Sequence, residues 1–206
     1  IEGIDIMLAI DVSTSMLAED LKPNRLEAAK DVAAEFINGR PNDNIGITLF
    51  AGETFTQCPL TVDHAVLLDM IHNIKCGLIT DGTAVGMGIA NAVTRLKDSK
   101  AKSKVIILLT DGTNNKGDIS PMTAAEIAKS FGIRVYTIGV GTNGMAPYPY
   151  PVGNTVQYVS MPVEIDEKTL TEIAGTTDGN YFRATSNSKL KEVYEEIDKL
   201  EKTKLN

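Results

Sequence analysis

The sequence predicts an α/β fold, with a doubly wound, mostly parallel central sheet, helices on both faces and one short antiparallel edge strand. The first observation is the pair of near-continuous apolar runs at residues 4–10 and 104–110, which are typical of strands covered on both faces. The second is the alternation of strands and helices along the chain, which favours parallel strands joined by right-handed crossovers. With 206 residues, 43% of them hydrophobic, the chain is predicted to form one domain over residues 1–206.

The elements can be placed in chain order from local patterns. After the strand at 4–10, Asn24 and Glu27 form a capping box that begins a helix, and Gly39 ends it. A strand at 45–50 leads to an alternating edge strand at 54–57, which we expect Pro59 to stop. Further helices are predicted at 63–73, 83–96, 121–131, 166–174 and 188–200, and further strands at 104–110, 133–138 and 181–183. Small residues in the first turns of one helix predict close approach to the sheet: Ala84, Gly86, Gly88 and Ala90.

Residues 142–162 are predicted to be an irregular loop insertion, because they contain four prolines and no clear period. The loop leaves the carboxyl end of a strand, and exposed aromatic side chains are favoured in protein interfaces. Met145, Tyr148 and Tyr150 are therefore candidate partner contacts. These three side chains and Tyr158 are explained equally well as core residues of a folded excursion that the segment itself forms.

Composition excludes several classes of function. The net charge of −7 without a basic cluster argues against nucleic acid as a partner. The G-x-G-x-x-G pattern at 139–144 follows a strand, but three prolines within seven residues forbid the helix that a nucleotide site requires.

Cys58 and Cys76 match no metal motif, and the helix predicted between them argues against a disulfide. No run approaches the roughly 18 apolar residues of a membrane span.

Short oxygen-bearing side chains gather where the predicted strands end. Asp11, Ser13 and Ser15 follow the first strand, and Asp111 follows the strand at 104–110. If these two strands are neighbours, their carboxyl ends bring the two carboxylates together at one edge of the sheet. Facing carboxylates repel unless a cation or proton lies between them, and hard oxygens suit Mg²⁺, Mn²⁺ or Ca²⁺. The first three residues alone are explained equally well as a polar turn.

The spacing Asp11-x-Ser13-x-Ser15, then Thr83, then Asp111-Gly112 resembles the metal-ion-dependent adhesion site of von Willebrand factor type A domains. This resemblance extends over essentially the whole chain in element order. It implies that Ser13, Ser15 and Thr83 coordinate a divalent cation, Mg²⁺ first among candidates, and that the aspartates bind through water. It also implies that an acidic side chain of a protein partner completes the coordination.

A narrower resemblance is to the bacterial Bat aerotolerance proteins, most of all to their A member. It is carried by residues 8–16, Asp20, Pro23 to Leu26, and the segments 50–52, 59–61 and 81–84. The resemblance implies a membrane-anchored parent protein with this domain on the periplasmic, non-cytoplasmic side, beside other Bat proteins or a MoxR-type ATPase system. The abrupt start at Ile1 and the solvated tail at 201–206 lead us to expect a soluble domain excised from that parent.

We therefore interpret the chain as a metal-dependent protein-protein interaction module and not an enzyme. One alternative is a Mg²⁺-dependent, phosphatase-like hydrolase, but we expect no His, Lys or Cys near the loops to act as base or nucleophile. Another alternative is a structural domain with a vestigial metal site.

Overall fold

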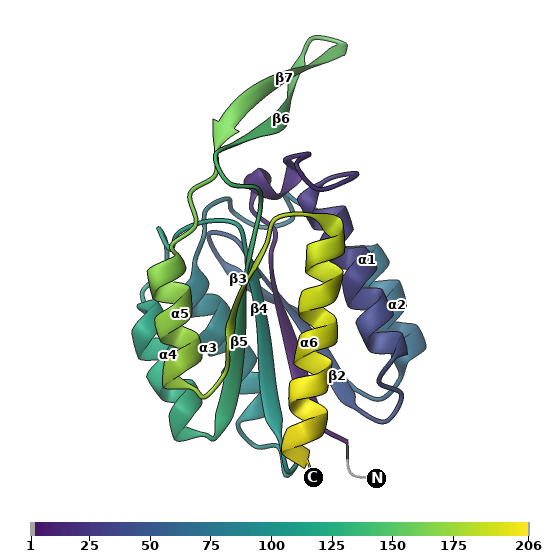
Figure 1. Cartoon of the computed structure of the whole chain (residues 1–206), viewed down its shortest axis with the longest axis vertical. Coiled ribbons are helices and arrows are strands. Elements are labelled where there is room, and N and C mark those ends of the chain that lie inside the picture. The colour runs from purple at the N-terminus through teal and green to yellow at the C-terminus, as the bar shows by residue number, and fades with distance from the viewer. Residues whose placement is uncertain (1–2, 206) are drawn as a thin grey trace.

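The computed structural model describes residues 3–205, and its core is a six-stranded sheet between two helical layers (Figure 1). The strand order is β3 (Thr54–Thr61), β2 (Asn44–Phe50), β1 (Asp5–Asp11), β4 (Lys104–Thr110), β5 (Ile133–Val140) and β8 (Tyr181–Ala184). All neighbouring pairs are parallel except β2 with the edge strand β3. The predicted doubly wound sheet is confirmed, and β1 and β4 are direct neighbours at its centre.

Alternate residues of the central strands supply two separate cores. On one face Ile6, Leu8 and Ile10 of β1 pack with the helices α1 (Arg25–Asn38), α2 (His64–His72) and α6 (Asn187–Leu205). On the other face Met7 and Ala9 pack with α3 (Val85–Leu96), α4 (Pro121–Ser130) and α5 (Glu167–Thr176). In the two central strands, β1 and β4, every interior position is buried and apolar, so their polar residues stand at the strand ends.

The small residues of α3 permit the close contacts that the sequence predicts. A Cβ atom at Gly88 would lie 2.8 Å from the ring of Phe50 in β2. A Cβ atom at Gly86 would lie 2.1 Å from the carbonyl oxygen of Ile119, in the segment that leads into α4. Both positions therefore require glycine because neighbouring atoms occupy the space of a side chain.

Two boundaries differ from the sequence-based expectation. Strand β3 continues through Pro59 to Thr61, because an edge strand tolerates a residue without an N–H donor. Helix α6 continues to Leu205, so the segment predicted as a tail is helical, with residues 202–204 exposed as expected; Asn206 lies outside the described residues. Glu201 is buried and pairs with Arg134 of β5, a contact between distant segments that no local pattern predicts. Among residues 3–205, no helix combines the length and apolar composition needed to cross a membrane.

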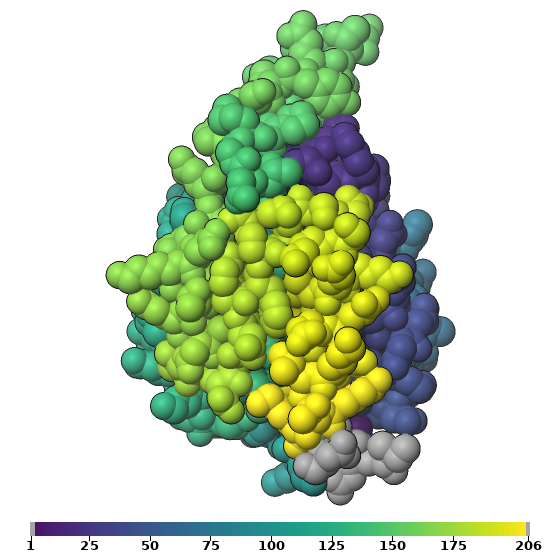
Figure 2. Space-filling model, viewed as in Figure 1, coloured from purple at the N-terminus to yellow at the C-terminus, as the bar shows by residue number. Residues whose placement is uncertain are grey.

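The largest difference concerns residues 142–162, which form a regular hairpin instead of an irregular loop. Strands β6 (Met145–Val152) and β7 (Thr155–Pro162) pair antiparallel in register over their full length. Gly153, with φ of +60°, makes the two-residue turn between them. The prolines of β6 predict a loop because they lack an N–H donor. They are compatible with the strand because they alternate with the residues that form the cross-strand hydrogen bonds. The hairpin projects from the carboxyl-end edge of the sheet, clear of the helical layers (Figures 1 and 2).

Candidate metal centre

The two candidate carboxylates lie side by side at the carboxyl-end edge of the sheet. Asp11 is the last residue of β1, and Asp111 directly follows β4, the strand paired with β1. Beyond Asp11 the chain forms a loop of residues 12–17, called the first loop below, which contains the 3-10 helix η1 (Thr14–Leu17) and crosses the strand ends. Neighbouring parallel strands therefore bring together residues that are 100 positions apart in the sequence.

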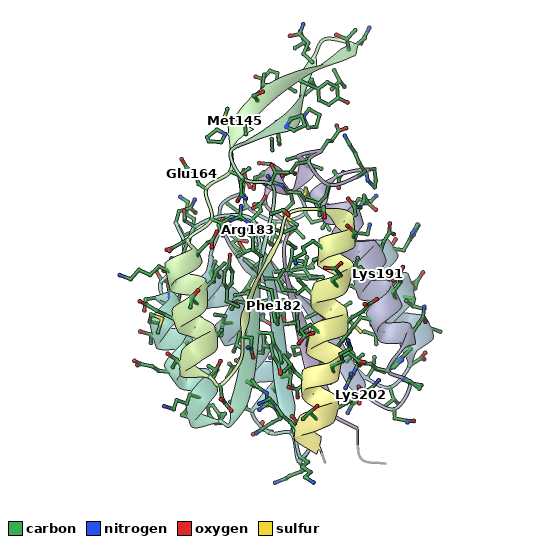
Figure 3. All side chains as sticks on the ribbon, viewed as in Figure 1. Met145, Glu164, Phe182, Arg183, Lys191 and Lys202 are labelled. Carbon is green, nitrogen blue, oxygen red and sulfur yellow. The ribbon has the colours of Figure 1, made fainter. Side chains whose placement is uncertain are left out.

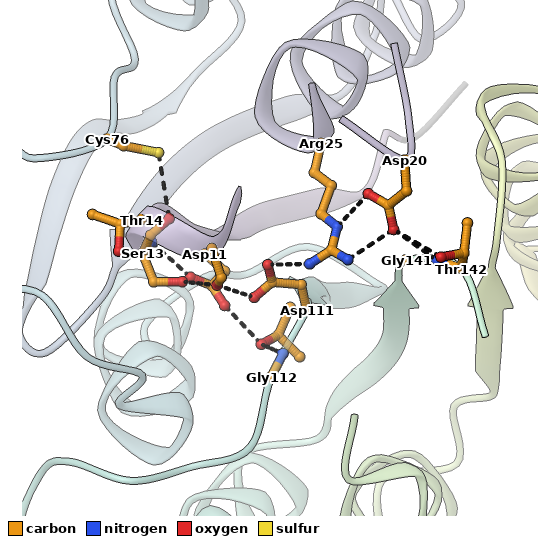
Figure 4. A network of polar contacts seen from close by, with 12 residues as sticks. Asp11, Ser13, Thr14, Asp20, Arg25, Cys76, Asp111, Gly112, Gly141 and Thr142 are labelled. Atoms are coloured by element: carbon orange, nitrogen blue, oxygen red, sulfur yellow. Dashed lines mark hydrogen bonds and ion pairs between the residues drawn. The ribbon is translucent and has the colours of Figure 1, made fainter. Parts of the chain in front are cut away.

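A chain of hydrogen bonds connects the candidate ligands (Figure 4). The Asp11 Oδ1 atom accepts a hydrogen bond from the backbone N–H of Ser13 at 2.8 Å. The hydroxyl oxygens of Ser13 and Ser15 are 3.0 Å apart, and the Ser15 hydroxyl donates to Asp111 Oδ1 at 2.9 Å. Four of the five predicted site residues are thus directly connected. Their donor atoms are all oxygens.

Both carboxylates are buried, and their electrostatic environment disfavours two negative charges. Burial and the neighbouring Asp111 carboxylate raise the pKa of Asp11 to about 7. Burial also raises the pKa of Asp111, although the adjacent Arg25 guanidinium acts in the opposite direction. The Thr110 hydroxyl donates to Asp11 Oδ2 at 2.8 Å, so this carboxylate already has two donors. A cation bound beside the pair would remove the repulsion that raises these pKa values.

Arg25 is a member of the site that the sequence analysis did not identify. It lies at the first position of α1, is almost fully buried, and donates from Nη1 to Asp111 Oδ2 at 2.8 Å. Its Nε and Nη2 atoms bind both carboxylate oxygens of Asp20 at 2.7 Å. One local signal in the sequence could have indicated this role, because Arg25 is a basic residue at a helix N-terminus. The helix dipole disfavours positive charge there unless carboxylates balance it.

The ion pair of Arg25 with Asp20 connects the site to the base of the hairpin. Asp20 Oδ2 also accepts a hydrogen bond from the backbone N–H of Thr142 at 2.9 Å. A Cβ atom at Gly141 would lie 3.0 Å from Arg25 Nη2, so glycine is needed where the guanidinium passes the chain. The G-x-G-x-x-G pattern that includes Gly141 leads into β6 and not into a helix, as the prolines that follow it predict.

Thr83, the fifth predicted residue, reaches the same edge from the segment before α3. It is buried, and its hydroxyl oxygen would lie 3.7 Å from a Cβ atom placed at Gly112. Within residues 3–205, its hydroxyl makes no hydrogen bond to the four connected residues. Its backbone exchanges two hydrogen bonds of 2.9 Å with Asn115, and the nearby Asp81 carboxylate binds the backbone and side chain of Thr14. These contacts hold the threonine segment against the first loop.

The donor set fits a hard divalent cation. Within residues 3–205, no group of three or more His, Cys, Asp or Glu could hold a metal, so an ion here would depend on hydroxyl ligands. Two carboxylates and three hydroxyls from three segments supply oxygen atoms alone, which suit Mg²⁺, Mn²⁺ or Ca²⁺. Asp11, Asp111, Asp20 and Arg25 carry a formal net charge of −2 when ionised. A divalent cation would balance that charge.

The expectation that no cysteine lies near the loops of the site was wrong. Cys76 lies beside the first loop, and its thiol donates to the carbonyl oxygen of Ser13 at 3.4 Å. Burial, with the Asp11 and Asp111 charges, raises the pKa of this thiol to about 12. Both cysteines are free, as the sequence predicts.

The candidate partner contacts divide between the two faces of the hairpin. Tyr148 and Tyr150 line a cleft beside Thr14 and Ser15. Met145 is exposed near the base of the hairpin and, by register, belongs to the opposite face (Figure 3). None of the three is buried: Met145 and Tyr150 are exposed, and Tyr148 is half-buried. Their role as partner contacts stays a prediction.

Comparison with known proteins connects this geometry to a family. A family profile, described as von Willebrand factor type A domain, matches residues 5–196. An uncharacterized protein from Borreliella burgdorferi is 31% identical over 182 residues, which cover 87% of this chain and 53% of that protein. A UPF0353 protein from Nocardia farcinica is 32% identical over 211 residues, covering 94% and 62%. The chain therefore spans less than two thirds of the length of these relatives.

Solved structures agree with this assignment. BatB from Bacteroides thetaiotaomicron, described as a conserved hypothetical protein, is 35% identical with a TM-score of 0.84, covering 97% of this chain and 100% of that one. An aerotolerance-related membrane protein from Bacteroides fragilis is 32% identical with a TM-score of 0.83, covering 96% and 98%. Proximal thread matrix protein 1 from the mussel byssus, 24% identical with a TM-score of 0.76 over 97% of this chain and 46% of that one, shares the fold. The chain belongs to the von Willebrand factor type A domain family and is similar to Bat aerotolerance-related proteins.

Proposed function

We propose that this domain is an interaction module that binds an acidic side chain of a protein partner through a divalent cation. Asp11, Ser13, Ser15, Thr83 and Asp111 hold the ion, for which Mg²⁺ is the first candidate and Mn²⁺ or Ca²⁺ are alternatives. The observation that carries this proposal is the buried carboxylate pair connected through two serine hydroxyls. Such a pair is electrostatically costly without a cation, and it is placed at the edge where ligands bind in α/β sheets.

The charge of the site supports recognition of a carboxylate. The formal charge of −2 from Asp11, Asp111, Asp20 and Arg25 balances one divalent ion. Serine and threonine hydroxyls add ligands without adding negative charge. The ion therefore remains able to attract a further anionic oxygen from outside the chain.

The surroundings favour binding over hydrolysis. Cys76 is the side chain beside this loop that could act as a nucleophile, but burial raises the pKa of its thiol and so disfavours the reactive thiolate. Its thiol is also engaged with the carbonyl oxygen of Ser13. Membership of the von Willebrand factor type A domain family supports this choice, because domains of this family are in general interaction modules.

We also propose a cellular setting, which is supported by the similarity to an aerotolerance-related membrane protein. In this proposal the parent of the domain belongs to a membrane-associated complex, and the domain lies on the non-cytoplasmic side. Its partners would then be other Bat proteins or a MoxR-type ATPase system. Either partner would present a Glu or Asp carboxylate to the ion.

Calorimetric titration of the chain with MgCl₂ and MnCl₂ tests the metal site. We expect saturable one-to-one binding to the wild type and loss of that binding in Asp11→Asn and Ser13→Ala. Ser130→Ala, which changes an exposed serine at the far end of α4, is the matched control and should bind metal normally. Normal titration of the Asp11→Asn protein, or no metal binding by the wild type, would refute the proposal.

A further inference from the structure

The hairpin differs in composition from the rest of the chain. Residues 142–163 contain no Asp, Glu, Lys, Arg or His, although 23% of the whole chain is charged. Every residue of β7 is exposed, and the exposed apolar side chains include Tyr150, Val152, Val156, Tyr158 and Val159. Figure 2 shows this segment standing clear of the body of the molecule. An uncharged, apolar surface of this kind typically marks an interaction site.

The strand register places one face of the hairpin over the first loop, which carries the candidate metal ligands Ser13 and Ser15. Directly paired residues share a face, so Ala146 with Met161 and Tyr148 with Val159 lie on the same side as Tyr150. Side chains of this face and of the first loop surround a cleft of about 440 Å³. Its lining residues are Thr14, Ser15, Tyr148, Tyr150, Val159 and Met161. The opposite face carries Val156, Tyr158 and the prolines of β6.

The open edge of β6 cannot extend the sheet by regular pairing. Three prolines of β6 alternate with the residues that form hydrogen bonds to β7: Pro147, Pro149 and Pro151. The backbone nitrogen and carbonyl groups of these prolines therefore point to the open edge of β6. The carbonyl oxygen of Pro147 confirms this direction, because it accepts a hydrogen bond of 2.8 Å from the N–H of Glu19 in the loop after η1. An edge without N–H donors at three successive positions offers no ladder to a partner strand. A partner segment in the cleft therefore cannot pair with β6, and contacts there depend on side chains.

We propose that the cleft receives a partner segment in which a Glu or Asp is flanked by aliphatic or aromatic side chains. This inference rests on the proposed function and specifies its partner. Ser15 is both a lining residue of the cleft and a candidate metal ligand. When a partner carboxylate binds the ion, the residues before and after it in the partner would therefore lie against the hairpin. Charged neighbours would lose hydration there without meeting an opposite charge on residues 142–163. Apolar neighbours would cover the tyrosine, valine and methionine side chains.

A peptide array provides the first test. The probe is the full chain in MnCl₂, and the array holds degenerate peptides with a fixed central Glu and two varied positions on each side. We expect selection of Leu, Ile, Val, Met, Phe or Tyr beside the central Glu, and loss of signal in EDTA or when Gln replaces the Glu. Selection of charged flanking residues, absence of any flanking preference, or absence of any bound peptide would overturn the inference.

Two matched pairs of variants test which face of the hairpin binds. Tyr150 and Tyr158 are 57% and 59% exposed on opposite faces of the hairpin, and Val159 and Val156 form a second such pair. For the selected peptide, we expect Tyr150→Ala and Val159→Ala to weaken the Kd by about tenfold, as for buried interface contacts. Tyr158→Ala and Val156→Ala should change it by less than about twofold. Equal losses on both faces would overturn the inference.

Further outcomes separate this inference from the proposed function. If peptide binding is Glu-dependent and EDTA-sensitive but Tyr150→Ala has no effect, the metal-bridge function stands and the cleft assignment fails. If binding persists in EDTA and with Gln in the peptide, the proposed function itself fails. Sedimentation equilibrium tests a second copy as the occupant. A wild-type dimer that Tyr150→Ala dissociates would overturn the proposed partner.

Discussion

Arg25 determines how the two sides of the site are held together. Its guanidinium bridges Asp111 of the candidate metal centre and Asp20, which in turn binds the backbone of Thr142 below the hairpin (Figure 4). All three charged side chains are almost fully buried. Water therefore cannot replace a missing partner, and each charge depends on the others.

Arg25→Ala should lower the free energy of unfolding by about 3–5 kcal/mol, because it leaves two buried carboxylates without their counter-charge. Urea denaturation followed by circular dichroism measures the change. Lys189→Ala is the matched control, since the pair of Lys189 with Glu192 is exposed at 3.7 Å and contributes at most about 1 kcal/mol. Equal stability of the Arg25→Ala and Lys189→Ala proteins would contradict this account of the pair.

At the scale of elements, α6 is anchored to the sheet by a polar contact as well as by apolar packing. Leu190, Val193, Tyr194 and Ile197 pack in the core, and one turn later Glu201 meets β5. The Glu201 carboxylate accepts hydrogen bonds from Arg134, Tyr136 and Ser103. Burial alone would raise the pKa of Glu201, but these donors outweigh it and hold the pKa below its ordinary value of 4.5.

This lowered pKa predicts a pH dependence of stability. A carboxyl group with a lower pKa in the folded state contributes stability above pH 4.5, and the contribution is lost as the pH falls through the folded value. Urea denaturation at several pH values should show wild type more stable than Glu201→Gln at pH 7. The difference should shrink as the pH falls below 4.5. A difference that stays constant down to pH 3 would show that the carboxylate is not the source.

At the scale of the whole molecule, the hairpin and the body are nearly independent in packing. Only Ala146 among the residues of β6 and β7 is buried, and contacts to the body are concentrated at the base, where Glu19 binds Pro147 and Val163 binds Gly144. The six-stranded sheet and its two cores are complete without the outer half of the hairpin. The domain therefore consists of a scaffold that carries the candidate metal ligands and an arm that we propose as the partner contact.

Replacement of residues 149–158 by Asn-Gly tests this separation. The shortened hairpin keeps Tyr148 and Val159 as the pair that closes a two-residue turn, and it keeps the Pro147 carbonyl bonded to Glu19. We expect the free energy of unfolding to change by less than about 1 kcal/mol. Metal titration should be unchanged, while affinity for the selected peptide falls. A large loss of stability or of metal binding would show that the arm supports the scaffold.

Much of the fold follows from local patterns in the sequence. The apolar runs of β1 and β4, the cap at Asn24 and the glycines of α3 are local signals, and each predicts an element at the right place. The hairpin was missed because prolines at alternate positions resemble a loop when pairing is unknown. The length of α6 was missed because the burial of Glu201 depends on Arg134, a residue 67 positions away.

The sequence by itself determined the α/β class, the strand ends that carry Asp11 and Asp111, and the oxygen chemistry of the candidate metal ligands. Those features depend on the order and chemistry of neighbouring residues. Only the tertiary structure decided that Arg25 and Asp20 balance the site, that Cys76 lies beside it, and which face of the hairpin overlooks it. The physical reason is that burial, pKa shifts and clefts arise from groups that meet only when distant segments pack together.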